Sequence, residues 1–301
     1  YSEAELERIA RAYSEAISPL IGEKIDIPAP DVNTNGKIMS WMVDAYENVV
    51  KHSAPGVFTG KPVEFGGSLA RTEATGYGVN FAAVQALEKL GKDVKGATYA
   101  IQGFGNVGYH TGYYAHKAGA KIVAVSTVDV AIYNENGLDM EAIIKEFQTK
   151  GFITNEAGYG KEISNAELLA LEVDVLAPCA LENQLTSENA GKVRAKIVVE
   201  GANGPTTPEA DVILRQNGVL VVPDILANCG GVVVSYFEWV QNLQGYYWEF
   251  DEVQEKETVV LRRAFRDIWN LAQEYDVDLR TASYMMSIRR VEKAMKLRGW
   301  Y

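Results

Sequence analysis

The sequence predicts an α/β fold with a doubly wound sheet, in which helices cover both faces of the sheet. Short apolar runs rich in β-branched residues alternate with helical stretches through the middle of the chain, which is the pattern of such sheets. One of these runs leads directly into a glycine-rich turn and a helix. The 301 residues, of which 47% are hydrophobic and 23% charged, are sufficient for one or two domains with buried cores.

The start of the chain predicts two helices separated by a stiff loop. Ser2 and Glu5 have the spacing of a capping box, and apolar residues follow at helical intervals. The prolines of segment 28–30 end this helix, because proline lacks an N–H and restricts the residue before it. A second helix is expected to begin after Asn33 or Thr34.

The middle of the chain predicts the sheet, and the end predicts helices alone. Residues 52–68 are rich in Gly, Pro and Ser and are expected to form a linker. The expected strands of the sheet are residues 97–102, 121–126, 173–177, 196–200 and 219–222. From Asn228 onward the spacing of apolar residues predicts three amphipathic helices and no strand.

The strongest local signal is the segment Gly103-Phe104-Gly105-Asn106-Val107-Gly108, which follows a predicted strand and opens a helix. In this motif the first glycine permits a tight turn, the second lets the backbone approach a pyrophosphate, and the third allows close helix–strand packing. This context favours dinucleotide binding over a purely structural turn. Asp129 lies 21 residues beyond Gly108, where a carboxylate binds an adenosine ribose and disfavours the 2′-phosphate of NADP. The alternative is that Asp129 serves a turn or a helix cap.

Asp31 is the candidate acid for proton transfer. The adjacent prolines stiffen its loop, and proton transfer requires accurate placement of the acid. On the residues alone, the alternative is an aspartate that caps a helix or closes a turn.

Composition excludes several classes of function. The 29 Lys and Arg residues against 40 Asp and Glu give a net charge of −11, which disfavours nucleic-acid and anionic-membrane partners. No apolar stretch is long enough for a membrane span, no signal peptide is visible, and the two cysteines form no disulfide framework. The three histidines lack metal-ligand spacing, so no metal site is predicted. These features predict a cytoplasmic protein.

Other distinctive segments are spread along the chain: Pro28-Ala29-Pro30-Asp31-Val32, Gly60-Lys61-Pro62, Gly66-Gly67-Ser68, Arg71-Thr72-Glu73-Ala74-Thr75-Gly76, Asp174-Val175-Leu176-Ala177-Pro178, and residues 200–210 and 223–239. Together with the glycine turn, they resemble the glutamate dehydrogenases of the amino-acid dehydrogenase superfamily, most closely those of thermophilic bacteria and archaea. The resemblance implies reversible oxidative deamination of L-glutamate to 2-oxoglutarate and ammonia, with hydride transfer to NAD or NADP.

The resemblance also assigns roles to residues. Asp31 corresponds to the catalytic aspartate of the family, which handles protons at the α-amino nitrogen. The substrate pocket corresponds to Ala29, Val232 and Ser235. A hydroxyl at Ser235 can bond the side-chain carboxylate of glutamate, whereas leucine and phenylalanine dehydrogenases are expected to present an apolar residue there. The implied cofactor-binding residues are Arg71, Thr75, Gly103, Gly105, Asn106, Val107, Gly108, Asp129, Asn203 and Asn228. Among them, Thr75 and Asn228 correspond to family positions that contact the nicotinamide end.

The same resemblance implies the organisation of the chain. Residues 52–227 are expected to form a Rossmann-type dinucleotide-binding domain in which one strand is reversed. Residues 1–51 and 228–301 are expected to belong to a second, substrate-binding domain. Relatives are commonly hexamers. We therefore expect a homo-oligomer, which by this resemblance would be a hexamer.

The sequence departs from the family in two places. Family members begin with a further N-terminal portion, whose glycine-flanked lysine run binds the substrate carboxylates, and no such run is present. We therefore expect a family member that lacks this portion. Two alternatives remain open, namely a leucine- or phenylalanine-type dehydrogenase and a catalytically inactive dinucleotide-binding module. Thr127 stands where many thermophilic relatives have an acid, so either NAD or NADP is expected as the cofactor. NAD is favoured because of the carboxylate of Asp129.

Overall fold

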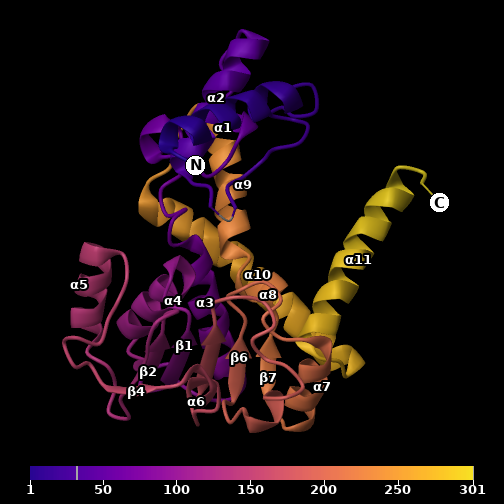
Figure 1. Ribbon diagram of the computed structural model, residues 1–301. Coiled ribbons are helices and arrows are strands. Elements are labelled where there is room, and N and C mark those ends of the chain that lie inside the picture. Colours follow the sequence, from indigo (N-terminus) through magenta and orange to yellow (C-terminus); the bar gives the residue numbers. More distant parts are fainter. Residues whose placement is uncertain (32, 301) are drawn as a thin grey trace. The chain divides into compact units, whose positions relative to one another are not determined.

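The computed structural model describes residues 1–31 and 33–300, and its contacts divide the chain into two compact units. We call them the helical unit and the sheet unit. The helical unit comprises Tyr1–Ala74 and Gly231–Glu257, and the sheet unit comprises Thr75–Gly230 and Thr258–Tyr301. Figure 1 follows the elements of each unit along the chain.

The described part of the helical unit consists of helices and loops. Its elements are α1 (Glu3–Ile17), α2 (Gly36–Val50), the short 3-10 helices η1 (Pro55–Val57) and η2 (Val63–Phe65), most of α9 (Gly230–Gln244) and the first turns of α10 (Phe250–Tyr275). The predicted capping box is confirmed, because the N–H and the hydroxyl of Ser2 both donate to Glu5 Oε2 at 2.7 Å. α1 packs on α2 through small residues, Ala10 and Ser14, and the Ser14 hydroxyl donates to the Met42 carbonyl at 2.6 Å.

The start of α2 differs from the prediction by one or two residues. Asn35 is the N-cap, and its side chain accepts the Ile38 N–H at 3.1 Å. Asn33 has a φ of 60°, which is left-handed backbone, whereas an N-cap has extended backbone. Asn33 therefore belongs to the turn before the helix.

The sheet unit contains a seven-stranded sheet in the order β4-β3-β2-β1-β5-β6-β7. Its strands are β1 (Thr98–Gln102), β2 (Lys121–Ser126), β3 (Ala131–Tyr133), β4 (Lys161–Ile163), β5 (Val175–Pro178), β6 (Ile197–Val199) and β7 (Leu220–Val222). Neighbouring strands from β2 through β1 to β7 pair in parallel, whereas β3 is antiparallel to both β2 and β4. The α/β class is confirmed, and β3 is a reversed strand of the kind that the resemblance implies.

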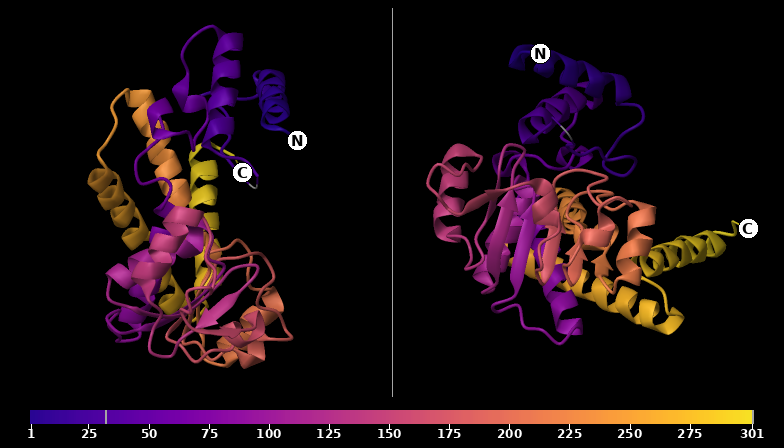
Figure 2. Two further views of the ribbon diagram at one scale, coloured as in Figure 1. Left: turned by 60° about the vertical axis from the view of Figure 1, so that its left-hand side comes forward. Right: turned by 60° about the horizontal axis from the view of Figure 1, so that its bottom comes forward.

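Helices cover both faces of this sheet (Figure 2). One face packs against α3 (Ala74–Lys89), α4 (Asn106–Lys117), α5 (Met140–Lys150), α8 (Asp224–Ala227), α10 and α11 (Leu279–Leu297). The other face packs against α6 (Asn165–Leu169), the 3-10 helix η3 (Ala190–Lys192) and α7 (Pro208–Gln216). Successive residues of β1 alternate between the two cores, with Tyr99 and Ile101 in the first and Ala100 in the second. The sheet is therefore doubly wound.

Residues 52–68 do not form the predicted linker. They belong to the helical unit, and Val57 and Phe58 are fully buried in its core beside α2. Gly and Pro residues in this segment shape its tight turns and do not indicate chain freedom. The helical unit therefore extends to Ala74, beyond the expected boundary at residue 51.

The three helices predicted after Asn228 are α9, α10 and α11, but they are divided between the two units. Residues from Thr258 onward belong to the sheet unit, because Phe265 and Ala282 are buried in the core on one face of the sheet. The division of the structure thus differs from the expected return of residues 228–301 to the substrate domain.

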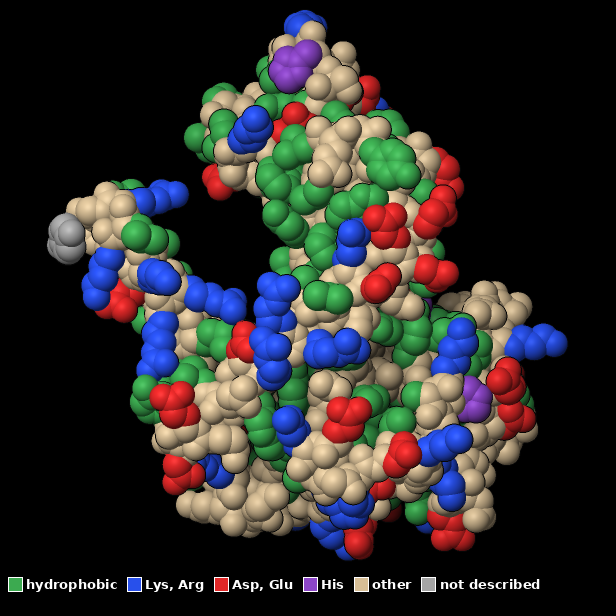
Figure 3. Space-filling model, turned by 180° about the vertical axis from the view of Figure 1, so that it is seen from behind, with side chains coloured by type: hydrophobic (Ala, Val, Ile, Leu, Met, Phe, Trp, Pro, Cys, Tyr) green, Lys and Arg blue, Asp and Glu red, His purple; other side chains and the backbone are tan. Residues whose placement is uncertain are grey.

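The C-terminal half of α11 projects from the sheet unit. Residues 287–300 are exposed, and Figure 3 shows Lys and Arg side chains gathered along this segment. The basic residues there are Arg289, Arg290, Lys293, Lys296 and Arg298. Among the helices of the described residues, none has both the length and the apolar character to cross a membrane.

Leu87 tests the assigned core of the sheet unit. Its side chain is 0% exposed in α3, so Leu87→Ala should lower the free energy of unfolding by about 2–5 kcal/mol through lost burial and a residual cavity. Leu90 is 44% exposed, and Leu90→Ala should change the same quantity by less than about 1 kcal/mol. Urea unfolding of both variants measures the difference, and equal losses would contradict the core assignment.

Candidate active site

The glycine turn lies between β1 and α4, and each of its glycines has a distinct steric role. Gly103 has a φ of +86°, and a Cβ there would lie 2.6 Å from Ala180 Cα. A Cβ at Gly108 would lie 2.0 Å from the Gly103 carbonyl oxygen, so helix and turn could not pack as they do. A Cβ at Gly105 would meet no atom within 4 Å. The first and third glycines are thus required by the fold, and the second borders open space.

The surroundings of the turn fit a dinucleotide cofactor. α4 begins at Asn106, directly after Gly105, so the positive end of a helix borders the open space. Phe104 N–H donates to the Ser126 carbonyl at 2.6 Å, and Gly103 N–H donates to Ser126 Oγ at 3.2 Å, which attaches the turn to the end of β2. A pyrophosphate over Gly105 would meet backbone donors on a rigid support.

Thr75 lies at the start of α3, which packs closely on α4. A Cβ added to Gly76 would lie 2.6 Å from the Val107 carbonyl oxygen and 2.5 Å from His110 Cβ, so only glycine permits this approach. The contact places Thr75 beside the first turn of α4, the helix that the glycine turn opens.

Asp129 lies in the turn that joins β2 to β3, beyond the end of β2. Thr127 Oγ1 accepts the N–H groups of Asp129 and Val130 at 3.3 and 3.2 Å, and Thr127 N–H donates to the Val130 carbonyl at 2.7 Å. Asp129 is exposed. The structure therefore gives this residue a place in a tight turn, and its contact with a ribose stays a prediction.

The structure brings together two of the predicted cofactor residues, Asn203 and Asn228. Asn228 Nδ2 donates to Asn203 Oδ1 at 2.7 Å and to the Gly201 carbonyl at 3.3 Å. Asn203 lies in the loop after β6, and Asn228 directly follows α8. The two amides thus form one polar group beyond the carboxyl end of β6, where doubly wound sheets bind ligands.

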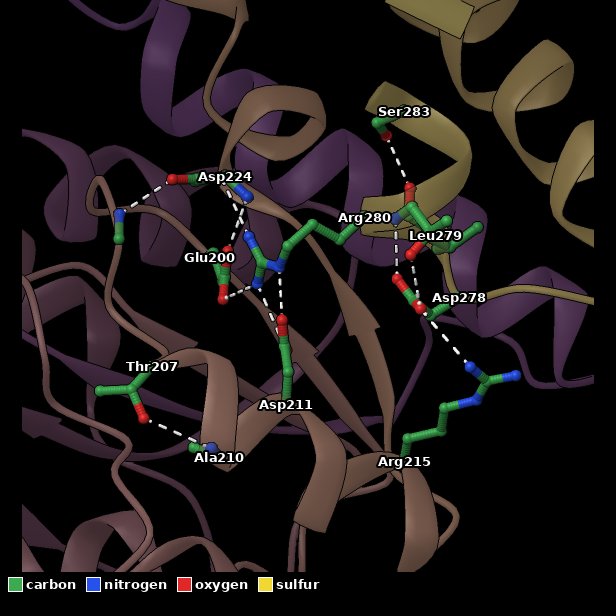
Figure 4. Close-up of polar contacts among 12 residues, drawn as sticks. Glu200, Thr207, Ala210, Asp211, Arg215, Asp224, Asp278, Leu279, Arg280 and Ser283 are labelled. Carbon is green, nitrogen blue, oxygen red and sulfur yellow. Dashed lines mark hydrogen bonds and ion pairs between the residues drawn. The ribbon is translucent and has the colours of Figure 1, made fainter. Parts of the chain in front are cut away.

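Sequence reasoning missed a network of charged residues in the sheet unit (Figure 4). Arg280, near the start of α11, contacts three carboxylates: Nη2 lies 2.6 Å from Glu200 Oε1, Nη1 lies 3.3 Å from Asp224 Oδ1, and Nε pairs with Asp211. Glu200 is fully buried. Burial raises the pKa of Glu200, and its hydrogen bond to Arg280 opposes that shift. One guanidinium therefore joins β6, α7, α8 and α11.

In the helical unit the structure joins two predicted residues, Arg71 and Ser235. Arg71 Nε donates to Ser235 Oγ at 2.8 Å, and Ser235 is 9% exposed on α9. Burial lowers the pKa of Arg71, and the negative charge of Glu238 opposes this shift. Val232, about one helical turn before Ser235, is 67% exposed.

Asp31 and Ala29 lie on an exposed loop that precedes α2. Asp31 N–H donates to Thr34 Oγ1 at 2.6 Å, and Thr34 N–H donates to the Asp31 carbonyl at 2.9 Å. These bonds close a turn around the aspartate. Val32, the last residue of the proline motif, lies outside the described residues.

A buried ion pair supports this loop and was also missed. Lys61 Nζ lies 2.7 Å from Glu238 Oε1, and both side chains are 0% exposed. Glu238 also accepts the N–H groups of Gly60 and Lys61, at 2.9 and 3.3 Å. Gly60 has a φ of +76°, and a Cβ there would lie 2.5 Å from the Pro30 ring. The pair thus fixes the turn on which the proline loop packs.

A third feature that the sequence did not reveal is Glu257, which is fully buried in α10. Both of its carboxylate oxygens lack a hydrogen-bond partner within the described part of the chain. Burial raises the pKa of Glu257 to about 9; the negative charge of Glu73 adds to the shift, and the positive charge of Arg71 opposes it. Glu257 is therefore protonated at neutral pH.

The missed residues differ in the signals they leave in the sequence. Glu238, like the predicted residue Ser235, interrupts the apolar run 229–240, and a polar residue in such a run indicates a buried partner. Arg280 leaves no comparable signal, because its partner Glu200 is 80 residues away.

The doubly wound sheet and its glycine turn define a dinucleotide-binding protein of the Rossmann type. Comparison with known proteins then gives the family. The model described as Glutamate/Leucine/Phenylalanine/Valine dehydrogenase matches residues 66–299, and the model described as Glu/Leu/Phe/Val dehydrogenase, dimerisation domain, matches residues 1–48. The chain belongs to this dehydrogenase family.

Relatives include the NAD-specific glutamate dehydrogenase of Clostridioides difficile, which is 54% identical over 305 residues covering 100% of this chain and 72% of the relative. The glutamate dehydrogenase of Thermotoga maritima is 50% identical, with 100% and 72% covered. Among solved structures, the glutamate dehydrogenase from Peptoniphilus asaccharolyticus has a TM-score of 0.87 at 43% identity and covers 100% of this chain, which spans 72% of that one. The hetero-hexameric glutamate dehydrogenase from Thermus thermophilus, in its Leu-bound form, has a TM-score of 0.93 at 35% identity, with 100% and 71% covered. The resemblance to glutamate dehydrogenases is confirmed.

The glycine turn gives a paired prediction. Gly105→Ala should weaken NADH binding about tenfold or more, because the methyl group would occupy the space of the pyrophosphate, while the free energy of unfolding changes by less than about 1 kcal/mol. Gly108→Ala should instead destabilise the fold, because its Cβ would overlap the Gly103 carbonyl oxygen. NADH fluorescence titration and urea unfolding separate the two effects. Unchanged NADH affinity in Gly105→Ala would show that no phosphate lies over the turn.

Glu257 gives a prediction of pH dependence. Its pKa is about 9 in the folded protein against a usual 4.5, so the folded state binds an extra proton between these values. Its stabilising contribution is complete below pH 4.5 and decreases as pH rises toward 9, by up to about 1.4 kcal/mol per pH unit. Glu257→Gln removes this dependence, so the variant should gain stability over the wild type as pH rises.

Urea unfolding at pH 6 and pH 8.5 measures this effect. Glu255→Gln is the matched control, because Glu255 is an exposed glutamate on the same helix. The control should keep the wild-type pH dependence. A parallel dependence in Glu257→Gln and wild type would show that Glu257 does not hold the extra proton.

Proposed function

We propose that the protein catalyses the reversible oxidative deamination of L-glutamate to 2-oxoglutarate and ammonia, with NAD as the favoured acceptor. The observation that carries this proposal is the partly buried hydrogen bond between Arg71 and Ser235. Membership of the dehydrogenase family and the names of its glutamate-specific relatives support it.

The Arg71–Ser235 pair suits a substrate with a second carboxylate. Because Ser235 Oγ accepts from Arg71 Nε, its own hydroxyl proton is left to donate to another acceptor. A glutamate side-chain carboxylate would accept that proton and be attracted by the guanidinium. The apolar side chains of leucine or valine would leave the Ser235 hydroxyl proton without this acceptor, which costs about 1–3 kcal/mol. Ala29 and Val232 are proposed to complete the pocket.

Asp31 is the proposed proton carrier. Its turn holds the carboxylate on a loop that is fixed by the Lys61–Glu238 pair, and its exposure leaves it accessible to a substrate. In this role Asp31 takes a proton from the α-amino nitrogen or from water during deamination and returns it in the reverse reaction. The dinucleotide, when bound, supplies the hydride acceptor.

The cofactor-binding residues are proposed to be those of the glycine turn together with Arg71, Thr75, Asp129, Asn203 and Asn228. NAD is favoured over NADP because several relatives are named NAD-specific, and because a carboxylate at Asp129 would repel a 2′-phosphate. The match of residues 1–48 to a dimerisation domain and the hexameric Thermus thermophilus relative support assembly of several copies, for which we propose a hexamer.

Two substitutions test the proposed roles in the protein with its natural termini. Asp31→Asn should lower kcat at least about 100-fold and leave NADH binding unchanged, because proton transfer fails while the sheet unit is intact. Ser235→Ala should lower kcat/KM for L-glutamate about 5- to 150-fold through the lost hydrogen bond. Absorbance of reduced nicotinamide measures turnover with L-glutamate, L-leucine, L-phenylalanine and L-valine, each with NAD and with NADP.

Ser40→Ala serves as the control for Ser235→Ala. Ser40 also lies in the helical unit, but its hydroxyl donates only to the Gly36 carbonyl of its own helix in the described contacts, so its kcat/KM should match the wild type. Turnover of an apolar amino acid in preference to glutamate would replace the proposed substrate. NADH binding without turnover of any of the four amino acids would overturn the enzymatic proposal.

A further inference from the structure

Four elements of the sheet unit converge on the guanidinium of Arg280 (Figure 4). Arg280 is the second residue of α11, Glu200 directly follows β6, Asp211 lies in α7 and Asp224 is the first residue of α8. Three carboxylates surround this one cation. Two of them, Glu200 and Asp224, also make hydrogen bonds beyond Arg280, and these bonds extend the network to other parts of the sheet unit.

Glu200 connects Arg280 to the start of α8. Its Oε1 accepts from Arg280 Nη2 at 2.6 Å, and its Oε2 accepts the backbone N–H of Asp224 at 2.7 Å. Glu200 is 0% exposed, so its charge is stabilised by these partners and not by bulk water. Removal of Arg280 would leave a buried carboxylate without its cation, and the carboxylate would then protonate or move.

Asp224 connects the same network to both asparagines of the proposed cofactor site. Its Oδ2 accepts the N–H of Gly204, the residue after Asn203, at 2.8 Å. Its carbonyl accepts the N–H of Asn228 at 2.9 Å, where α8 ends. The two side-chain amides then bond each other at 2.7 Å. Hydrogen bonds and ion pairs therefore connect Arg280 to the backbone of Gly204 and Asn228, and this backbone carries the two amides.

The loop after β6 is anchored by backbone bonds on both sides of Asn203. The N–H groups of Gly201 and Ala202 donate to the Pro178 carbonyl at 3.0 and 2.9 Å, and the Pro205 carbonyl accepts from Leu185 at 2.8 Å. The Gly204 carbonyl accepts the Asn183 N–H at 2.9 Å, so Asn203 lies between backbone anchors on both sides. Asp224 adds a charged acceptor for the Gly204 N–H directly after Asn203.

We propose that Arg280 is a positioning residue for the nicotinamide end of the cofactor, acting through Glu200 and Asp224 on the amides of Asn203 and Asn228. The proposal rests on the proposed function, which assigns these two amides to the dinucleotide, and on the correspondence of Asn228 to a family position that contacts the nicotinamide end. Arg280 itself contacts no cofactor in this role. A lysine could not replace it, because an ammonium lacks the planar group of donors that reaches three carboxylates at once.

The test compares binding of two ligands by calorimetric titration, independently of turnover. NADH contains the nicotinamide, whereas ADP-ribose contains only the remainder of the dinucleotide. Arg280→Met should weaken NADH binding about tenfold and leave ADP-ribose binding within about twofold, because the disturbed amides serve the nicotinamide end. Arg280→Lys should fall between Arg280→Met and the wild type, and it provides a variant that retains the charge if Arg280→Met does not fold.

Asp211→Asn is the matched control for a merely structural role. It removes another ion pair of Arg280 but leaves the contacts to Glu200 and Asp224 in place. This variant should lose thermal stability while its ratio of NADH to ADP-ribose affinity stays at the wild-type value.

The outcomes distinguish failure of this proposal from failure of the proposed function. Equal weakening of both ligands in the Arg280 variants, no weakening of either, or the same change of ratio in Asp211→Asn, would overturn the positioning role. Failure of the wild-type protein to bind NADH and ADP-ribose would instead overturn the proposed function on which it rests.

Discussion

The carboxylate of Glu238 accepts three hydrogen bonds from a single turn, and the geometry of the helical unit depends on this interaction. Two of the donors are the backbone N–H groups of Gly60 and Lys61, and the third is the Lys61 ammonium. Burial of two full charges is unfavourable by several kcal/mol for each ion unless nearly all of their hydrogen-bonding capacity is used. Here it is largely used, because the ammonium also donates to the Phe58 carbonyl at 2.6 Å. Loss of either partner would therefore release the turn against which the loop of Asp31 packs.

One helix carries this interaction and several others of the same kind. Along α9, Ser235 contacts Arg71, Gln241 donates to Ser68 Oγ at 2.8 Å, and Asn242 donates to the Gly66 carbonyl at 3.0 Å. Several polar residues of α9 therefore form hydrogen bonds with the segment 60–71. Protonation of Glu257 fits this arrangement, because a neutral acid near Arg71 does not compete with a substrate carboxylate for the guanidinium.

The sequence was most informative where the physical cause of a structure is local. The glycine turn was predictable because a strand, three glycines and a helix are contiguous, and their steric roles follow from the backbone alone. β3 and β4 were not predicted, because they lack the consecutive β-branched residues that mark the equally short β6 and β7. The polar networks were out of reach for another reason. Lys61 and Glu238 are 177 residues apart, and nothing in either local sequence specifies the other. Residues 52–68 were interpreted as a linker because their glycines and prolines are typical of linkers, whereas Val57 and Phe58 are core residues.

The division of the chain has a consequence for the order of its synthesis. The sheet unit is discontinuous, since residues 231–257 of the helical unit lie between its two segments. A ribosome that has reached residue 257 has made all seven strands, but not the residues Phe265, Leu271 and Leu279 that bury one face of the sheet. The part of that face that α10 and α11 cover stays open until the last part of the chain emerges, although α3, α4, α5 and α8 have by then been made. Completion of the dinucleotide-binding core is therefore a late event in the synthesis of each chain.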